Sequence, residues 1–214
     1  MEESQELALT QLRKSVEKLS SSTEGYEKPT LMRFLIARSM NPDKAAKMFV
    51  DWQKWRASMI PPSGFIPDSD RKFLVHVLDK SIASAIQGKE VGDEKVACLI
   101  DLQNITYKNL DARGTITGFQ ILQAYYPERL SKCYILHMPG FFVTLWGFVC
   151  RFLDKATKEK IVIVTDSEEQ RKLEEEVGLD ALPEEYGGRA KLTAFQDVLP
   201  PLAAPRMLTT NNNA

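Results

Sequence analysis

Apolar residues recur every three or four positions along the first part of the chain. The pattern predicts a helix over residues 9–19, which ends in a stretch of serine, glycine and proline, and a second helix over 31–40. A third helix is predicted over 43–59, because an Asn-Pro-Asp sequence in front of it supplies a cap, a first-turn proline and an acid. We expect residues 1–64 to form an N-terminal helical unit.

Beyond the proline-rich stretch 61–67, short apolar runs of strand length alternate with helical patterns. Strands joined by crossovers of a dozen or more residues pair in parallel, with helices on the faces of the sheet. We therefore predict an α/β domain with a mostly parallel sheet over 65–198, followed by a disordered tail over 199–214. The predicted strands are 95–102, 132–138, 160–166 and a weak one near 191–197; the predicted helices are 69–88, 115–126, 141–155 and 167–178.

One of these helices lacks a polar face. From Pro139 to Cys150 the chain has no charged residue, and the helix is apolar nearly all round over three turns. A helix that packs one face on a sheet is polar on the other unless protein, a partner or a lipid covers it. Periodicity alone leaves these coverings open, and an ordinary core is among them. The run is also shorter than the roughly 20 residues that span a bilayer.

Composition narrows the classes of partner and chemistry. The chain has 28 Lys and Arg residues against 29 Asp and Glu, so its net charge of −1 gives no general attraction for nucleic acid. Its three cysteines show no C-x-x-C spacing, which favours buried, reduced thiols in a cytosolic protein over disulfides or a metal site. His76 and His137 are far apart, and His137 continues an apolar strand, so we expect a hydrogen-bonded core histidine.

Enzyme motifs are missing from the sequence. It has no G-x-S-x-G elbow, no phosphate-binding G-x-x-x-x-G-K-[ST] loop and no G-x-G-x-x-G after a strand. We therefore expect no catalysis and no cofactor. The first residues include acids where a signal peptide has bases, so we also expect a cytoplasmic protein.

Five segments occur in the order and approximate spacing of one known family. They read LMRFLIAR, IDLQNITYKNL, YYPERLSKCYILHMPGFF, FLDKATKEKIVIV and LPEEYGG. Over roughly residues 30–198 the chain resembles the CRAL-TRIO lipid-transfer family, and in particular its phosphatidylinositol-transfer-type members. The resemblance implies a non-enzymatic carrier with an apolar pocket whose floor is the sheet. It also implies that helix 141–155 is a mobile gate, which contacts lipid when closed and a membrane surface, transiently, when open.

The resemblance also implies which residues bind the ligand. Glu128, in the YPER motif, and Lys160, before the last strand, would serve an inositol phosphate headgroup. Thr106 falls, with a looser match of its neighbours, where hydroxyls help to hold the phosphate of a choline lipid in the family. From the residues alone, we would expect Glu128 and Lys160 to be solvated charges at the end of a helix or strand, as most Glu and Lys residues are. The expected pocket and gate residues are Phe119, Tyr126, Tyr134, Phe141, Phe142, Leu145, Trp146, Phe148 and Val149.

The chain departs from the family's pattern at one place. Members carry two further strands before the helix that begins near residue 69, and here a strand-sized block is missing after residue 68 or so. Losing two strands would expose backbone N–H and C=O groups and open one pocket wall to water. This leaves a second hypothesis, a lipid-free module that binds a membrane surface or another protein.

Overall fold

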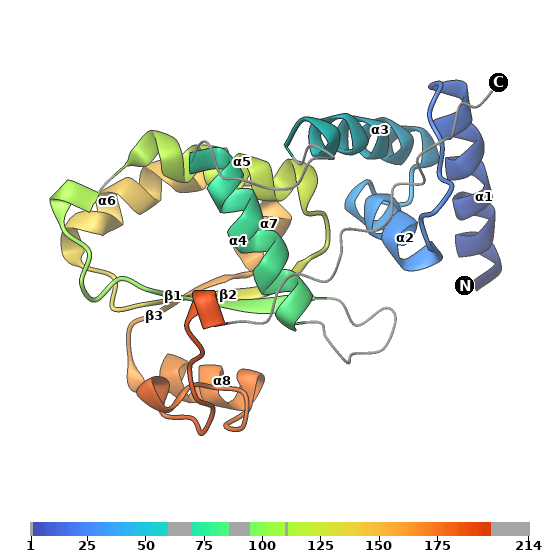
Figure 1. Cartoon of the computed structure of the whole chain (residues 1–214). Helices are drawn as coiled ribbons and strands as arrows, with labels where there is room; N and C mark the ends of the chain where they lie inside the picture. Colours follow the sequence, from blue (N-terminus) through green and yellow to red (C-terminus); the bar gives the residue numbers. More distant parts are fainter. Residues whose placement is uncertain (1, 60–69, 86–94, 110, 198–214) are drawn as a thin grey trace. The chain divides into compact units, whose positions relative to one another are not determined.

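The chain forms two compact units in the computed structural model (Figure 1). The model describes residues 2–59, 70–85, 95–109 and 111–197. Of these, the first unit takes the residues within Met1–Glu94 and Ala124–Glu128, and the second takes those within Lys95–Gln123 and Arg129–Leu199. The predicted loop at 61–67, the predicted loss of strands after residue 68 and the predicted disorder of the tail lie outside the described residues.

The first unit is helical, as the sequence predicts. It contains α1 (Glu2–Lys18), α2 (Lys28–Ala37), α3 (Pro42–Met59) and α4 (Asp70–Ala85). The apolar faces of α1, α2 and α3 meet in one core, where the rings of Phe34 and Phe49 pack edge to face with centroids 5.1 Å apart. The predicted cap of α3 is present, because the side chain of Asn41 accepts a hydrogen bond from the Lys44 N–H at 3.0 Å.

This unit extends past residue 64, where the sequence analysis ends it. Arg56 on α3 is ion-paired with Asp79 on α4 at 2.7 Å, and the Tyr126 hydroxyl donates to the same carboxylate at 2.8 Å. Tyr125 stacks on Trp55 with ring centroids 4.1 Å apart. Polar and aromatic contacts therefore hold α4 and the tyrosine pair of the YYPER sequence in the helical unit.

The second unit is built on a parallel sheet. It has three strands, β1 (Val96–Asp101), β2 (Leu130–Leu136) and β3 (Ile161–Val164), in the order β1-β2-β3. Both pairs are parallel, as the strand and helix alternation predicts. The sheet is accompanied by the 3₁₀ turn Tyr107–Asn109 and by α5 (Ala112–Tyr125), α6 (Gly140–Val149), α7 (Lys155–Glu159) and α8 (Ser167–Val177).

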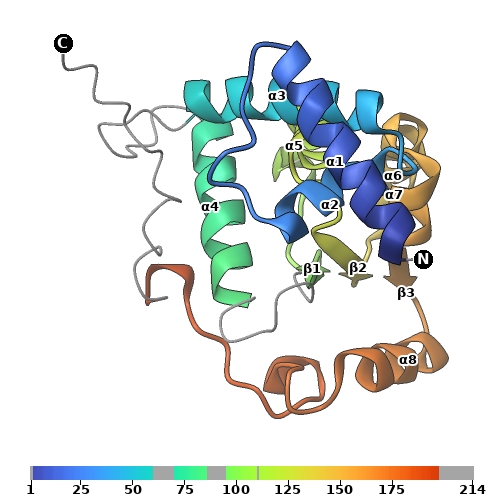
Figure 2. The ribbon, with the colours of Figure 1, turned by 90° about the vertical axis from the view of Figure 1, so that its right-hand side faces the viewer.

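Each face of this sheet has its own apolar cluster. Cys133 and Ile135 of β2 pack with Phe142 of α6, whereas Tyr134 and Leu136 pack on the other face with residues that include Leu173 of α8. Both views of the ribbon accordingly place α8 across the sheet from α6 (Figures 1 and 2). Because helices cover both faces, the strands are apolar on both sides.

Two predicted elements differ from the structure. The predicted helix 141–155 ends as an α-helix at Val149 and continues as one 3₁₀ turn, after which Leu153 is extended. Asp154 then caps α7 by accepting a hydrogen bond from the Thr157 N–H. The weak strand predicted near 191–197 is wrong, because that segment ends in the 3₁₀ turn Phe195–Asp197.

The LPEEYGG segment owes its shape to its glycines. Gly187 has a φ of +90°, a conformation that other residues rarely adopt. A Cβ on Gly188 would lie 1.8 Å from the carbonyl oxygen of Leu182, so no side chain fits there. No helix among the described residues has the length and apolar character that crossing a bilayer requires.

Candidate functional site

An apolar cavity of about 210 Å³ lies in the second unit. Ile100 and Ile135, neighbours across β1 and β2, contribute to its lining from the sheet, and Phe142 and Trp146 contribute from α6. Phe119 of α5 adds a further wall, with its ring edge to face with Trp146 at 6.0 Å. The complete lining is Ile100, Leu102, Ile105, Asn109, Asp111, Thr115, Phe119, Ile135, Phe142 and Trp146.

The polar groups of this lining come from one part of the chain. Asn109, Asp111 and Thr115 follow the carboxyl end of β1, where ligands of parallel α/β sheets commonly bind. Asp111 accepts hydrogen bonds from the Gly114 N–H and, through its backbone oxygen, from the Thr115 hydroxyl. The cavity is thus apolar with a small polar group, the usual make-up of a small-molecule site.

A second, more open hollow of about 570 Å³ borders the same helix. Trp146 belongs to the linings of both spaces. The second lining also includes Val143 of α6 and residues 161–163 of β3, with Thr165 and Glu169 as its polar members. Trp146 is therefore the residue that the two linings share.

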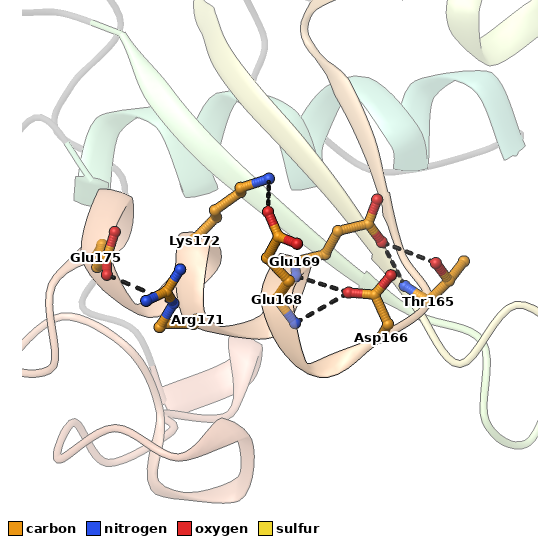
Figure 3. Close-up of polar contacts among 7 residues, drawn as sticks. All are labelled: Thr165, Asp166, Glu168, Glu169, Arg171, Lys172 and Glu175. Carbon is orange, nitrogen blue, oxygen red and sulfur yellow. Dashed lines mark hydrogen bonds and ion pairs between the residues drawn. The ribbon is translucent and has the colours of Figure 1, made fainter.

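Local hydrogen bonds fix the polar members of the second hollow (Figure 3). Glu169 accepts from the N–H and the hydroxyl of Thr165, and Asp166 caps α8 by accepting from the Glu168 and Glu169 N–H groups. Farther along α8, Lys172 is ion-paired with Glu168, four positions earlier, on the exposed face of the helix. Figure 3 thus shows two carboxylates at the start of α8, Asp166 and Glu169, each accepting a hydrogen bond from a backbone N–H nearby.

The helix α6 presents aromatic residues both inward and outward. Phe142 and Val149 are buried, while Phe141 and Leu145 are half-buried in the cluster on the cavity side of the sheet. Phe148 is 45% exposed, and it contacts the 44% exposed Phe152 edge to face at 5.3 Å. The apolar outer side that the sequence predicts is thus present, with these two rings open to solvent.

The two predicted headgroup residues precede neighbouring parallel strands. Glu128 lies two residues before β2, in the first unit, with a φ of +55°. Lys160 lies immediately before β3, in the second unit, and its carbonyl accepts a hydrogen bond from the Cys133 N–H at 2.8 Å. Both side chains are half-buried and have interaction partners.

Thr106 occupies the loop that follows β1. Its hydroxyl donates to the side-chain oxygen of Asn109 at 2.8 Å, and its N–H donates to the same oxygen at 3.0 Å. Thr106 therefore shapes the loop that carries cavity residues, and its hydroxyl is exposed.

Two predicted pocket residues lie elsewhere. Tyr134 faces the opposite side of the sheet, where its hydroxyl donates to Glu176 of α8, because side chains alternate along β2 and Ile135 takes the cavity side. Tyr126 lies in the helical unit, where its hydroxyl bonds Asp79 and burial, followed by the Asp79 charge, raises its pKa. Contrary to the prediction, neither Tyr134 nor Tyr126 is among the residues that line the cavity.

Sequence reasoning missed a polar cluster at the carboxyl ends of β1 and β2. His137 Nδ1 donates to Asp101 at 2.8 Å, and the Tyr186 hydroxyl donates to the other carboxylate oxygen at 3.2 Å. The hydrogen bond from His137 is the main reason that the pKa of Asp101 lies below its ordinary value of 3.8. His137 is hydrogen-bonded as predicted, but it is 54% exposed rather than in the core. Asp101 also accepts a hydrogen bond from the Gln103 N–H at 2.9 Å.

Metal binding finds no support in this geometry. Within the part of the chain that the structure describes, no three His, Cys, Asp or Glu side chains are grouped so that they could hold a metal ion. The cavity lining offers one carboxylate and mostly hydrocarbon. The arrangement suits an apolar ligand with a polar end.

One family model, several known proteins and a solved structure are similar to this chain. The CRAL/TRIO domain model matches residues 54–188. The chain is 27% identical to the Sec14 cytosolic factor of Schizosaccharomyces pombe over 247 residues, which cover 87% of this chain and 83% of that protein. It is also 27% identical to the SEC14 cytosolic factor of Candida glabrata over 250 residues, covering 89% and 80% respectively.

Both alignments are longer than the 214 residues of this chain, so these relatives carry residues that have no counterpart here. A shorter stretch of 72 residues, 34% of this chain and 23% of the relative, is 42% identical to a CRAL-TRIO domain-containing protein of Saccharomyces cerevisiae. The crystal structure of Sfh5 has a TM-score of 0.61 over 92% of this chain and 91% of that one, at 15% identity. That likeness shows a shared fold.

Proposed function

The chain belongs to the CRAL/TRIO family, and on that premise we propose that it is a non-enzymatic carrier that binds one phospholipid and transfers it between membranes. The observation that carries the proposal is the apolar cavity between the sheet and α6, with Ile100 and Ile135 on one side and Phe142 and Trp146 on the other. Removing hydrocarbon from water is favourable by about 25 cal/mol per Å², so acyl chains would occupy such a space. The carrier would work in the cytoplasm and touch membranes only while it exchanges its ligand.

Phosphatidylinositol is the ligand that the charged residues favour. Lys160 would supply a cation for the phosphate diester, and Glu128 would accept hydrogen bonds from inositol hydroxyls or orient the lysine. Thr106, exposed in the loop that also carries Ile105 and Asn109, would add a hydroxyl contact to a phosphate. These three roles rest on the resemblance of the motifs.

Opening of α6 would admit the lipid. The helix ends at Val149, and the chain passes through one 3₁₀ turn and the extended Leu153 before α7 begins. Such a break gives the helix a connection that can change its backbone angles without unwinding α7. The exposed rings of Phe148 and Phe152 would enter the interfacial layer of a bilayer when α6 swings away from the sheet.

A second function is favoured by the size of the cavity. Sites for small molecules usually have volumes of about 300–1,000 Å³, and the cavity beside α6 has about 210 Å³. A chain that cannot enclose a lipid would instead use the exposed rings of α6 to bind a membrane surface or another protein, as a lipid-free module.

Native mass spectrometry separates the two functions. The full chain is incubated with phosphatidylcholine vesicles that contain phosphatidylinositol, recovered from them, and weighed intact before its lipid is identified. One phosphatidylinositol per folded chain is expected for the carrier. A folded chain that stays empty would reject the carrier and support the lipid-free module.

Substitution of Lys160 then tests the headgroup assignment. We expect Lys160→Ala to lower phosphatidylinositol transfer by about tenfold or more, the worth of one charge-assisted hydrogen bond, and to leave phosphatidylcholine transfer unchanged. Lys158→Ala is the matched control, since Lys158 is an exposed cation two residues away. Equal phosphatidylinositol transfer by wild type and Lys160→Ala would remove this lysine from the site.

A further inference from the structure

Two cysteines face each other across adjacent strands. Cys98 of β1 and Cys133 of β2 are register partners in the parallel pair. Adjacent strands lie about 4.7–4.9 Å apart, which falls within the Cα separation of about 4.4–6.8 Å that disulfides span. Both residues pack in the cluster on the cavity side of the sheet, so their side chains point to the same face. The backbone therefore already places two thiols where a disulfide can form.

The thiols also interact with each other. The interaction between the two thiols lowers the pKa of Cys98 and, together with burial, raises the pKa of Cys133. Cys98 is half-buried, whereas Cys133 is 4% exposed. The more accessible of the two thiols is thus the one that ionises first, and the thiolate is the nucleophilic form of cysteine. Cys133 lies beside it as a second thiol that can react later.

The third cysteine differs in each of these respects. Cys150 lies in the 3₁₀ turn after α6, away from any strand register, and burial raises its pKa. The chain therefore contains one pair of facing thiols, Cys98 and Cys133. Cys150, which has no thiol facing it across the sheet, serves as the unpaired comparison.

We propose that Cys98 and Cys133 form a reversible dithiol site that a peroxide oxidises to a disulfide joining β1 to β2. The Cys98 thiolate attacks one peroxide oxygen, the O–O bond breaks, and Cys98 becomes a sulfenic acid as the first water is released. The Cys133 sulfur then attacks the Cys98 sulfur, the S–S bond forms and a second water leaves. Two thiols lose two electrons and two protons, and one peroxide becomes two waters.

Oxidation would act on the sheet beside the cavity. Cys98 and Cys133 lie two residues before Ile100 and Ile135, the lining pair on the same face. Among the described strands β1 is at an edge of the sheet and pairs only with β2. A covalent bond at this position would fix that edge strand, and the amide hydrogens of Val96–Asp101 would exchange more slowly in the oxidised protein.

Peptide mapping tests the site on the full chain. Trypsin places Cys98 on peptide 96–108 but leaves Cys133 and Cys150 together on peptide 133–151, so the assay uses the Cys150→Ser variant, which leaves the pair intact. The protein is treated with hydrogen peroxide, the remaining thiols are alkylated, and the digest is analysed without reductant. We expect peptides 96–108 and 133–151 to be joined, and to separate after dithiothreitol.

Further variants check the order of the steps. In Cys133→Ser the reaction should stop at the sulfenic acid of Cys98, which dimedone traps on peptide 96–108; Cys133→Ala serves if the serine variant fails to fold. Alkylation of both cysteines in full after peroxide would overturn the proposal. So would a sulfinic acid on Cys98 in the Cys150→Ser protein, or disulfides formed only between chains.

Discussion

The ring of Tyr107 stacks on the ring of Phe141, with centroids 4.3 Å apart and planes inclined by 29°. Tyr107 lies in the 3₁₀ turn after β1, and Phe141 lies in the first turn of α6. Tyr107 is 71% exposed, so this contact is one of the few that its side chain makes. The stack fastens the start of α6 to the loop that carries the polar end of the cavity.

Removal of this stack should speed the release of a bound lipid. Aromatic pairs contribute about 0.5–1.5 kcal/mol beyond burial, so Tyr107→Ala should raise the release rate by about two- to tenfold if α6 opens at this end. Stopped-flow dequenching of a fluorescent phosphatidylcholine measures the rate. Tyr107→Phe keeps the ring and is expected to behave as wild type. Identical rates for Tyr107→Ala and wild type would show that opening does not break this contact.

The exposed rings of Phe148 on α6 and of Phe152 in the 3₁₀ turn after it should contribute to membrane binding and not to retention of the bound ligand. We expect Phe148→Ser combined with Phe152→Ser to weaken vesicle binding, since each exposed ring contributes apolar area to an interface. The lipid content of the purified protein should not change. Leu179→Ser is a suitable control, because Leu179 is also exposed but follows α8. Vesicle flotation measures the binding, and an unchanged bound fraction in the double variant would exclude these rings.

Asp79 should stabilise the helical unit more than a surface carboxylate does. Asp79→Ala removes the ion pair with Arg56 and the hydrogen bond from Tyr126, and we expect a loss of about 2 kcal/mol in the free energy of unfolding. Glu6→Ala breaks the exposed pair with Lys28 and should cost about 0–1 kcal/mol. Urea unfolding followed by circular dichroism compares them, and equal losses would contradict the argument.

Asp101 should make stability depend on pH in acid. Its pKa in the folded chain lies below the ordinary 3.8, chiefly because His137 donates to it, so the carboxylate stabilises the fold above that value. This contribution is lost as the pH falls from about 3.8 through the lower folded pKa, where the folded carboxyl is protonated. We expect Asp101→Asn to be less stable than wild type at pH 7, and the difference to shrink towards pH 3. A constant difference measured by urea unfolding from pH 7 to pH 3 would refute this origin.

The sequence allowed the elements and their parallel pairing to be predicted, because crossovers long enough for helices separate the strands. It did not allow the faces of β2 to be assigned. Residues Cys133 to Leu136 are all buried, since helices cover both sides of the sheet, and an uninterrupted apolar run has no alternation from which a face could be read. Tyr134 was consequently assigned to the wrong side, one residue away from Ile135.

Other differences arose from contacts between residues distant in the chain. His137 extends an apolar run, yet its φ of +51° turns it out of the strand towards Asp101 and solvent. Tyr126 is the first residue of the YPER motif that suggested a headgroup site, but its hydroxyl donates to Asp79, 47 positions earlier. The end of α6 could have been predicted, because Asp154 is a good cap and marks the start of a new helix within the single helix that was predicted over 141–155.

Trp146 belongs to the linings of the cavity and of the more open hollow, so one indole ring contributes to two apolar spaces. Rotation about its side-chain bonds would change the size of both spaces without any movement of the backbone. The length of tail that the unit accommodates would then be set by a rotamer. Selectivity among acyl chains and recognition of the headgroup would accordingly be separable traits, and each could change without the other.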